Sequence, residues 1–251
     1  MSNIHVSRIN RGWVIRSHEH VTAAEFAKAL APIRADGGGA VRWFVCEPTT
    51  DELACAKSHG LTPSAPLLHM RCALPLAPTH RLPEGFTTRP FRPGTDNDEW
   101  LALNARAFAG HPEQGHWTPA VLTERITEPW FDANGFLILD INGAMAGFCW
   151  TKTHAHSGPH DHNVHDHAVH DHNTADPAGE IYVVGVDPAH HGKGLGRALT
   201  IAGFAHLAHR GLRTGMLYVD GDNTPAIALY SSLGMSIAHR DAVFVGSISA
   251  N

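Results

Sequence analysis

Two periods of hydrophobic spacing follow one another in the carboxyl-terminal half of this chain. A run of β-branched residues from Ile181 to Val186 predicts a buried strand, which Asp187-Pro188 ends. Apolar residues then recur at three- and four-residue intervals, which predicts a helix with one face against a sheet. The residues with this spacing are Leu195, Ala198, Leu199 and Ala202. The predicted order is therefore strand, glycine-rich turn, helix.

The turn between that strand and helix has the composition of a phosphate-binding loop. Its backbone N–H groups and the positive end of the following helix both favour an anion. A Walker loop needs Lys and then Ser or Thr after its last glycine, whereas Arg197-Ala198 follows Gly196. The third glycine of a Rossmann fingerprint is also missing. The sequence predicts an anion cradle made of His191, Gly192, Lys193, Gly194, Leu195, Gly196 and Arg197.

A second strand and helix follow farther along the chain. Leu217–Val219 predicts a short strand, and Thr224 and Pro225 suit the N-cap and the first position of a helix. This helix carries Tyr230, and Gly234 is expected to end it.

Together these two units resemble the GCN5-related N-acetyltransferase family. The pyrophosphate loop of that family has the pattern Q/R-x-x-G-x-G/A, which is His191-x-x-Gly194-Leu195-Gly196 here, with His in place of Gln or Arg. The second signature, Asn-x-x-Ala-x-x-Leu-Tyr-x-x-Leu-Gly, lies at residues 223–234. The resemblance implies an α/β fold around a mostly antiparallel sheet and acetyl-CoA as the co-substrate. The coenzyme-binding residues that it implies are the cradle residues together with Val184, Gly185, Val186, Asn223, Thr224, Pro225, Ala226, Ile227 and Ala228.

Local segments between residues 86 and 245 are also similar to the mycothiol synthase family. The segments are Asn104–Phe108, His111–Gly115, Glu128–Asp132, Trp150–Lys152 and Gly179–Val186. That family acetylates the cysteinyl amine of cysteinyl-glucosaminyl-inositol, the last step of mycothiol biosynthesis. The resemblance implies this small-molecule substrate, and acceptor contacts at Glu113, Lys152, Glu180 and Tyr218. Two alternatives stay open, an acetyltransferase for another small amine or a peptide amino terminus, and a non-catalytic module that binds coenzyme or metal as a sensor.

Acetyl transfer to an amine needs a group that removes the amine proton, a donor to the thioester carbonyl and an acid for the leaving thiolate. Glu180, at the head of its strand, is the carboxylate expected to receive the proton. Tyr230 is the expected acid, since the Tyr of the second family signature lies near the thioester sulfur. A glycine inside a strand favours a bulge, so Gly185 predicts the place where the sheet splays around the coenzyme.

The amino-terminal half repeats part of the carboxyl-terminal half. Trp43-Phe44-Val45 matches Leu217-Tyr218-Val219. Ser58-His59-Gly60-Leu61 matches Ser232-Leu233-Gly234-Met235 at the same spacing and without a gap. Each half is therefore expected to contain a strand, a helix, a capping glycine and a further strand.

A proline-rich linker at residues 75–93 divides the chain into residues 1–74 and 94–251. We expect tandem acetyltransferase folds, the first short and degenerate, the second complete and catalytic. Thr49 and Ala56 replace the Asn and Tyr of the second signature. The amino-terminal half is therefore expected to contribute structure rather than turnover, and to lack the strands that normally come first.

Local signals predict several element boundaries. Thr22-x-x-Glu25 predicts a capping box for a helix over residues 22–31, and Thr95-x-x-Asp98 predicts a cap for a helix that runs to Phe108. Thr118-Pro119 predicts another helix start, and Asn142-Gly143 predicts a type I′ hairpin.

A histidine-rich insert occupies residues 154–178. Its repeated units are His160-Asp161-His162, His165-Asp166-His167 and His170-Asp171-His172. Imidazole and carboxylate groups at this density bind Zn²⁺ or Ni²⁺. The low complexity and the lack of apolar support favour a solvated loop with incidental metal affinity over a metal-storage loop or a catalytic centre. We therefore expect no catalytic metal.

Composition narrows the class of protein further. A net charge of −5 with histidine neutral argues against nucleic acid as a partner. No apolar run is long enough for a membrane span, and the first ten residues are too polar for a signal peptide. Four cysteines without a C-x-x-C pair favour reduced thiols. We expect a cytoplasmic enzyme that acts as a monomer.

Overall fold

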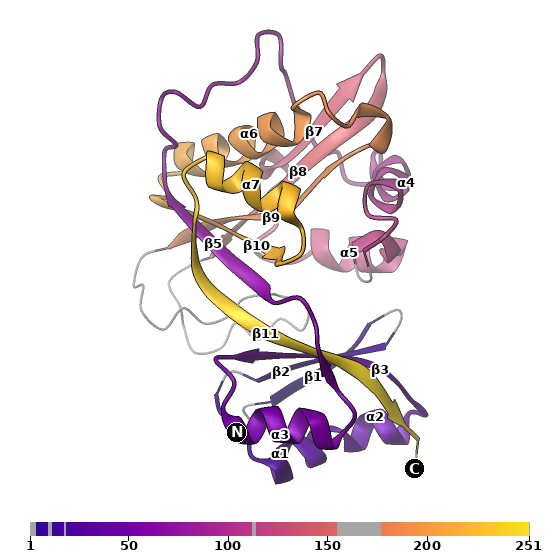
Figure 1. Cartoon of the computed structure of the whole chain (residues 1–251). Helices are drawn as coiled ribbons and strands as arrows, with labels where there is room; N and C mark the ends of the chain where they lie inside the picture. Colours follow the sequence, from indigo (N-terminus) through magenta and orange to yellow (C-terminus); the bar gives the residue numbers. More distant parts are fainter. Residues whose placement is uncertain (1–3, 10–11, 18, 112–113, 155–176, 251) are drawn as a thin grey trace.

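The computed structural model describes residues 4–9, 12–17, 19–111, 114–154 and 177–250. In this part of the chain, eleven strands form one sheet in the order β1-β2-β3-β11-β5-β10-β9-β8-β7-β6, and β4 pairs with β11. Helices lie on both faces of the upper part of the sheet in Figure 1, with α6 and α7 on one face and α4 and α5 on the other. The predicted α/β fold is confirmed.

The strands have the following bounds: β1 Ile4–Ile9, β2 Gly12–Ser17, β3 Gly38–Cys46, β4 Thr62–Pro63, β5 Leu67–Ala73, β6 Arg89–Pro90, β7 Phe136–Ile141, β8 Ala144–His154, β9 Ala178–Val186, β10 Thr214–Asp220 and β11 Ser236–Ser249. The α-helices are α1 Ala23–Ala29, α2 Ala31–Ala35, α3 Thr50–Ser58, α4 Asn97–Ala107, α5 Pro119–Ile126, α6 Leu195–His209 and α7 Thr224–Ser232. Three short 3₁₀ helices are η1 Gln114–His116, η2 Ala133–Gly135 and η3 Pro188–His190.

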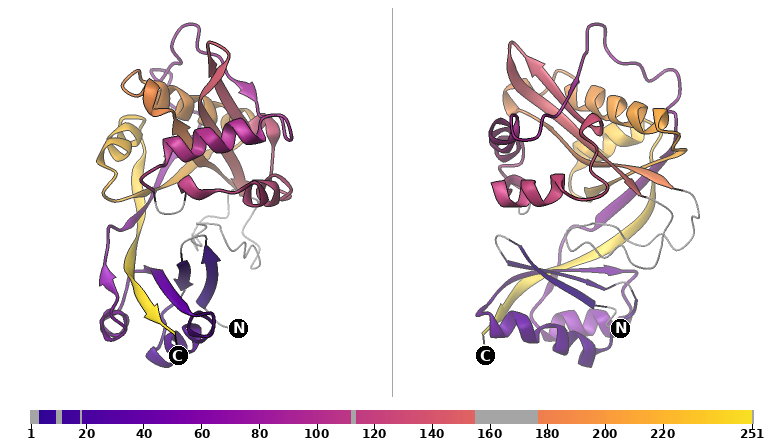
Figure 2. Two further views of the ribbon diagram at one scale, coloured as in Figure 1. Left: turned by 90° about the vertical axis from the view of Figure 1, so that its right-hand side faces the viewer. Right: turned by 180° about the vertical axis from the view of Figure 1, so that it is seen from behind.

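The two halves exchange their last strands. In the repeat, β3-α3-β5 of the amino-terminal half corresponds to β10-α7-β11 of the other half. However, β5 pairs with β10, β11 pairs with β3, and the two exchanged strands pair with each other. Both exchanged strands cross between the lower and upper parts of the molecule, as the views in Figure 2 show. The sheet is therefore continuous through both halves of the chain.

The amino-terminal half has two strands ahead of its first helix. β1 pairs antiparallel with β2, and β2 pairs parallel with β3, as β8, β9 and β10 do in the other half. In its described residues, this half has no counterpart of the strands β6 and β7 or of the helices α4 and α5. Of the leading strands that were expected to be missing, only the counterparts of β6 and β7 are absent from these residues. Its sheet is closed by the exchanged strand β11.

Several local predictions are confirmed because they depend only on neighbouring residues. Thr22 forms a complete capping box with Glu25, and Thr118 caps α5 by accepting from the Val121 N–H group. Asn142 and Gly143 have φ values of 53° and 82°, as a type I′ hairpin turn requires.

Two boundary predictions are wrong. Asn223, not Thr224, is the N-cap of α7, because its side chain accepts from Ala226 N. α4 begins after Asp96, whose carboxylate binds Arg89 and Arg92 in place of capping the helix. Within the expected linker, which stays a prediction, Arg89–Pro90 forms the short strand β6 beside β7.

Two apolar clusters hold the strands that later carry the site. One fills the space between the sheet and α6 and α7, with Phe204, Leu207 and Leu217 almost fully buried. The other lies under α4 and α5 and is aromatic, with Trp100 and Trp150 completely buried. Because interiors pack at crystal-like density, these clusters fix the positions of β8, β9 and β10.

Across the residues that the structure describes, no helix is long and apolar enough to cross a membrane.

Candidate active site

β9 and β10 run in parallel but separate part of the way along. They pair at three positions, the last being Met216 with Glu180. Beyond this point β9 continues to Val186 and β10 to Asp220 without further pairing to each other. The two strands thus leave a wedge between them, in which their backbone groups do not pair with each other.

The bulge beside this wedge lies at Tyr182, not at Gly185. The register of β8 and β9 shifts between Trp150, which pairs with Val183, and the next residue, which pairs with Ile181. Gly185 pairs regularly with Phe148, and a Cβ atom at Gly185 would lie 2.8 Å from Cε1 of that ring. The glycine is therefore explained by close packing, and the expected bulge position is corrected.

A cavity of about 230 Å³ opens at the wedge. The predicted site residues that line it are Glu180, Val184, Tyr218, Asn223, Ala226 and Tyr230. Phe108, His111 and Gln114 also line it and fall within segments that the sequence analysis singled out, whereas Arg42, Phe44 and Asp220 were not expected in the site. Two other predicted residues are neighbours of lining residues: Lys152 of β8 pairs with Glu180, and Gly185 follows Val184 in β9. Glu113 lies outside the described residues.

Glu180 is a buried carboxylate in a polar setting. Its side chain is 3% exposed, and its Oε2 lies 2.7 Å from Nε2 of His154. Across the β8–β9 ladder it pairs with Lys152, which is also buried and has its Nζ 4.8 Å from the centre of the Trp130 ring. Paired positions point to the same face of a sheet, so the carboxylate, the imidazole and the ammonium group form one cluster.

His154 was expected to begin the histidine-rich insert, but the structure shows it to be the last residue of β8. It lies two positions after Lys152, and in a strand that spacing places both side chains on one face. The alternation of β8 could therefore have indicated this contact. The repeated histidine units that follow lie outside the described residues.

Tyr230 reaches the cavity from α7. Asn223 fixes the start of this helix, since its side chain accepts from Ala226 N at 3.3 Å. The Tyr230 side chain is largely buried, and this burial raises the pKa of its hydroxyl above the ordinary value. The hydroxyl is therefore protonated at neutral pH and able to donate a proton or hydrogen bond into the cavity.

The glycine-rich turn leads into α6 at the end of β9. Gly194 is the N-cap of α6 with a φ of 75°, and a Cβ atom there or at Gly192 would meet nothing within 4 Å. The first-turn N–H groups of a helix have no partner within it, so this open end of α6 suits an anion. His191 supports the turn by donating from Nε2 to the Val186 carbonyl at 3.0 Å.

Two basic residues of the turn contact the chain itself. Lys193 Nζ lies 3.1 Å from His190 Nδ1. Arg197 donates to Ser232 Oγ at 2.5 Å and lies 3.1 Å from His80 Nδ1. Arg197 thereby ties α6 to the end of α7 and to the segment between the halves.

The amino-terminal half forms one wall of the cavity. Arg42 Nη2 lies 3.7 Å from one carboxylate oxygen of Asp220, and His111 Nε2 lies 3.4 Å from the other. The Arg42 guanidinium is also 5.2 Å from the centre of the Phe44 ring. No single motif indicated Arg42, because its place in the site depends on the strand exchange.

Comparison with known sequences identifies similar proteins. The model of the acetyltransferase (GNAT) family matches residues 97–235. A protein of Thermobispora bispora is 47% identical over 211 residues, which cover 83% of this chain and 66% of that protein. One of Salinispora arenicola is 55% identical over 161 residues, covering 63% of this chain and 47% of that protein. Both are named mycothiol acetyltransferase. The chain thus spans about half to two thirds of the length of these relatives.

Solved structures support the two-halved fold. A GCN5-related N-acetyltransferase from Sphaerobacter thermophilus superimposes with a TM-score of 0.71 at 22% identity, covering 99% of this chain and 77% of that one. A tandem GNAT protein from the clavulanic acid biosynthesis pathway superimposes with a TM-score of 0.60 at 16% identity, covering 99% and 85%. At these identities the likeness concerns the fold alone.

Proposed function

The chain belongs to the acetyltransferase (GNAT) family, and on that premise we propose that it transfers the acetyl group of acetyl-CoA to the cysteinyl amine of cysteinyl-glucosaminyl-inositol. The observation that carries the proposal is the identity with relatives named mycothiol acetyltransferase, which reaches 47% over 83% of this chain in the protein of Thermobispora bispora. This reaction is the last step of mycothiol biosynthesis.

The coenzyme side of the site is assigned to the wedge and the anion cradle. The open N-terminus of α6, with Gly192 and Gly194, suits the pyrophosphate of acetyl-CoA, because backbone N–H groups and the helix dipole meet there. The edge of β9 that does not pair with β10, at Val184 and Gly185, suits the amide groups of the pantetheine arm, next to the Val186 carbonyl that accepts from His191. When bound, acetyl-CoA supplies the activated acetyl group.

Proton transfer is assigned to Glu180 and Tyr230. Glu180 receives the proton of the acceptor ammonium directly or through water, and His154 at 2.7 Å orients its carboxylate. Tyr230 donates to the leaving sulfur, because its buried hydroxyl stays protonated. The two groups line one cavity from different elements, which allows both to act in a single turnover.

The acceptor side is assigned to the polar wall of the cavity. Asp220, which contacts Arg42 and His111, lines this cavity together with Glu180, and Lys152 pairs with Glu180 across the β8–β9 ladder. Hydroxyl groups of a sugar and of inositol are donors and acceptors that such groups can bind. Tyr218, stacked on His69 with ring centres 4.9 Å apart, adds an aromatic surface with a polar tip.

We also propose that the protein acts as a monomer in the cytoplasm and without a catalytic metal. All four cysteines are free thiols, which supports a reducing environment. The acid and base assigned above complete the proton transfers without a metal ion.

The direct test is to incubate the protein with acetyl-CoA and the cysteinyl acceptor and to locate the acetyl group by tandem mass spectrometry. We expect acetylation at the cysteinyl nitrogen, with the thiol still titratable. Glu180→Gln should lower the rate strongly while leaving the product the same. Absence of any acetylated product with the unmodified protein would refute the proposal, and acetylation of an unrelated amine alone would favour the family with a different acceptor.

A further inference from the structure

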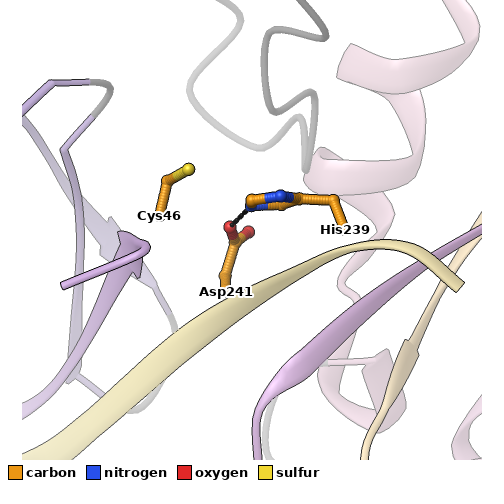
Figure 3. A group of neighbouring side chains, drawn as sticks. All are labelled: Cys46, His239 and Asp241. Atoms are coloured by element: carbon orange, nitrogen blue, oxygen red, sulfur yellow. Dashed lines mark hydrogen bonds and ion pairs between the residues drawn. The ribbon is translucent and has the colours of Figure 1, made fainter.

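Cys46, His239 and Asp241 form a compact cluster that the proposed reaction does not use (Figure 3). The sulfur, a ring nitrogen and a carboxylate oxygen all lie within 4.8 Å of one another. Within the described ranges, no other group of three or more His, Cys, Asp or Glu residues satisfies this criterion. In Figure 3 the Cys46 sulfur and the Asp241 carboxylate both point toward the space beside the His239 ring.

The backbone holds these side chains in place. Cys46 and Asp241 are directly paired residues of β3 and β11, so their side chains point to the same face of the sheet. His239 precedes Asp241 by two positions in β11 and therefore shares that face. A register shift between Ile237 and His239 marks a bulge just before it. Sites built on strands keep their ligand geometry better than sites on loops.

The chemistry of the three groups fits a transition metal. Thiolate, imidazole and carboxylate are the ligands of Zn²⁺, whereas Mg²⁺ and Ca²⁺ prefer oxygen ligands only. Zinc bonds of about 2.0 to 2.3 Å place ligand atoms roughly 3.5 Å apart, so a small inward rotation of the side chains suffices. We propose that Cys46, His239 and Asp241 bind one zinc ion, with water or a further donor completing a tetrahedron.

Two other interpretations of the cluster are weaker. A nucleophilic cysteine needs a lowered pKa, whereas burial and the negative charge of Asp241 raise the pKa of the Cys46 thiol. The second interpretation is a hydrogen-bonded pair of His239 and Asp241, which accounts for the 2.9 Å contact between His239 Nε2 and Asp241 Oδ1. It does not explain why the Cys46 sulfur lies within 4.8 Å of both groups. The negative groups around Cys46, which include Glu47 and Glu52, also favour a cation over an anion.

The position gives the metal a structural role. β3 belongs to the amino-terminal half, and β11 is the strand that it receives from the other half. One ion bound to both strands joins the exchanged strand to its acceptor sheet. Metal binding to the folded state alone stabilises it by mass action, so zinc should raise the thermal midpoint of unfolding.

The test is cobalt substitution in the whole 251-residue chain with its thiols reduced. A thiolate ligand gives Co²⁺ a strong near-ultraviolet charge-transfer absorption, and imidazole and carboxylate ligands do not. The histidine-rich insert contains no cysteine, so metal bound there is silent in this measurement. We expect the intensity of the absorption to correspond to one Co²⁺–thiolate bond per chain, and the absorption to disappear when excess Zn²⁺ is added.

Variants assign the absorption to the cluster. Cys46→Ser should abolish it, and His239→Gln should weaken the Co²⁺ affinity by about tenfold or more. Cys72→Ser is the matched control, since this half-buried thiol of β5 lies outside the cluster, and it should leave the titration unchanged. Far-ultraviolet circular dichroism checks folding, and His239→Gln keeps the test valid if Cys46→Ser fails to fold. The proposal is overturned if the unmodified protein gives no thiolate absorption, or if the absorption survives in the Cys46 and His239 variants.

Discussion

Glu180 and Tyr230 reach one cavity from two elements, and their surroundings suit different roles in proton transfer. Glu180 lies on β9 with the His154 imidazole 2.7 Å away, which gives its carboxylate a fixed partner. Tyr230 lies on α7 in an apolar setting that raises the pKa of its hydroxyl. A base with a polar partner and an acid kept protonated by burial are the two groups that acetyl transfer to an amine requires.

Replacement of Glu180 by Gln keeps the size of the side chain but removes the base. We expect kcat to fall by about 10²-fold or more, with little change in the KM for acetyl-CoA. His154→Gln should cause a smaller loss and shift the pH profile of kcat, because it removes the partner rather than the base itself. Steady-state kinetics over a pH series checks this, and a Glu180→Gln enzyme with unchanged kcat would rule out the assignment.

Replacement of Tyr230 by Phe removes only the hydroxyl. Because its pKa is raised above 10.0, the hydroxyl stays protonated through the whole range from pH 7 to pH 9. We therefore expect kcat to fall by a similar factor, about 10²-fold, at both pH values, with an unchanged KM for acetyl-CoA. A loss that disappears at pH 9 would mean that a different group is the acid.

At the scale of elements, the site depends on where β9 ends and α6 begins. The turn between them places the N-terminus of α6 at the open end of the wedge. Gly194 adopts a left-handed conformation there, and the space around its α-carbon is empty. The helix end is thus accessible to an anion such as the pyrophosphate of the coenzyme.

A Gly194→Glu substitution tests this role of α6. The new side chain would fill the empty space and place a negative charge at the cradle, so we expect calorimetry to show no acetyl-CoA binding. Gly211→Glu is the matched control, since Gly211 follows the other end of α6, has a φ of 86° and is equally open. Both variants carry a similar backbone strain of about 1 kcal/mol. Equal affinities in the two variants would exclude α6 as the anion site.

Elements defined by neighbouring residues could be predicted from the sequence. The apolar face of α6, the hairpin at Asn142 and the capping box at Thr22 depend on spacings of a few residues. The bulge at Tyr182 and the contribution of Arg42 depend on pairing between distant strands, which no local pattern records. The predicted residues Glu180, Tyr218 and Tyr230 do line one cavity, although their roles stay predictions.

At the scale of the whole molecule, the strand exchange makes the two halves parts of one sheet. β11 completes the amino-terminal half, and Phe244 on this strand packs against Trp43 with ring centres 5.6 Å apart. β5 supplies the neighbour of β10 on the other side. The amino-terminal half is thus joined to the cavity strands by backbone pairing, and its residues Arg42 and Phe44 form part of the cavity wall.

Phe244→Ala tests this coupling. Phe244 is 3% exposed, and removal of such a buried ring costs about 3 to 5 kcal/mol. Because the exchanged strands join the halves, we expect both halves to unfold in a single transition. The midpoint temperature of this transition should be lower in the variant than in the unmodified protein. Hydrogen exchange should report earlier opening at amides of both β3 and β10. Two separate transitions, with only the amino-terminal one shifted, would contradict the coupling.

The proposed function requires one specific acceptor, and a competition assay tests this requirement most directly. The unmodified protein is given acetyl-CoA with equal amounts of cysteinyl-glucosaminyl-inositol, free cysteine and glucosaminyl-inositol, and each product is quantified by mass. Polar groups of the cavity wall left unpaired by a truncated acceptor cost free energy, so kcat/KM for the complete acceptor should exceed the others by about 10³-fold or more. A preference for free cysteine, or equal use of all three, would contradict the proposed substrate.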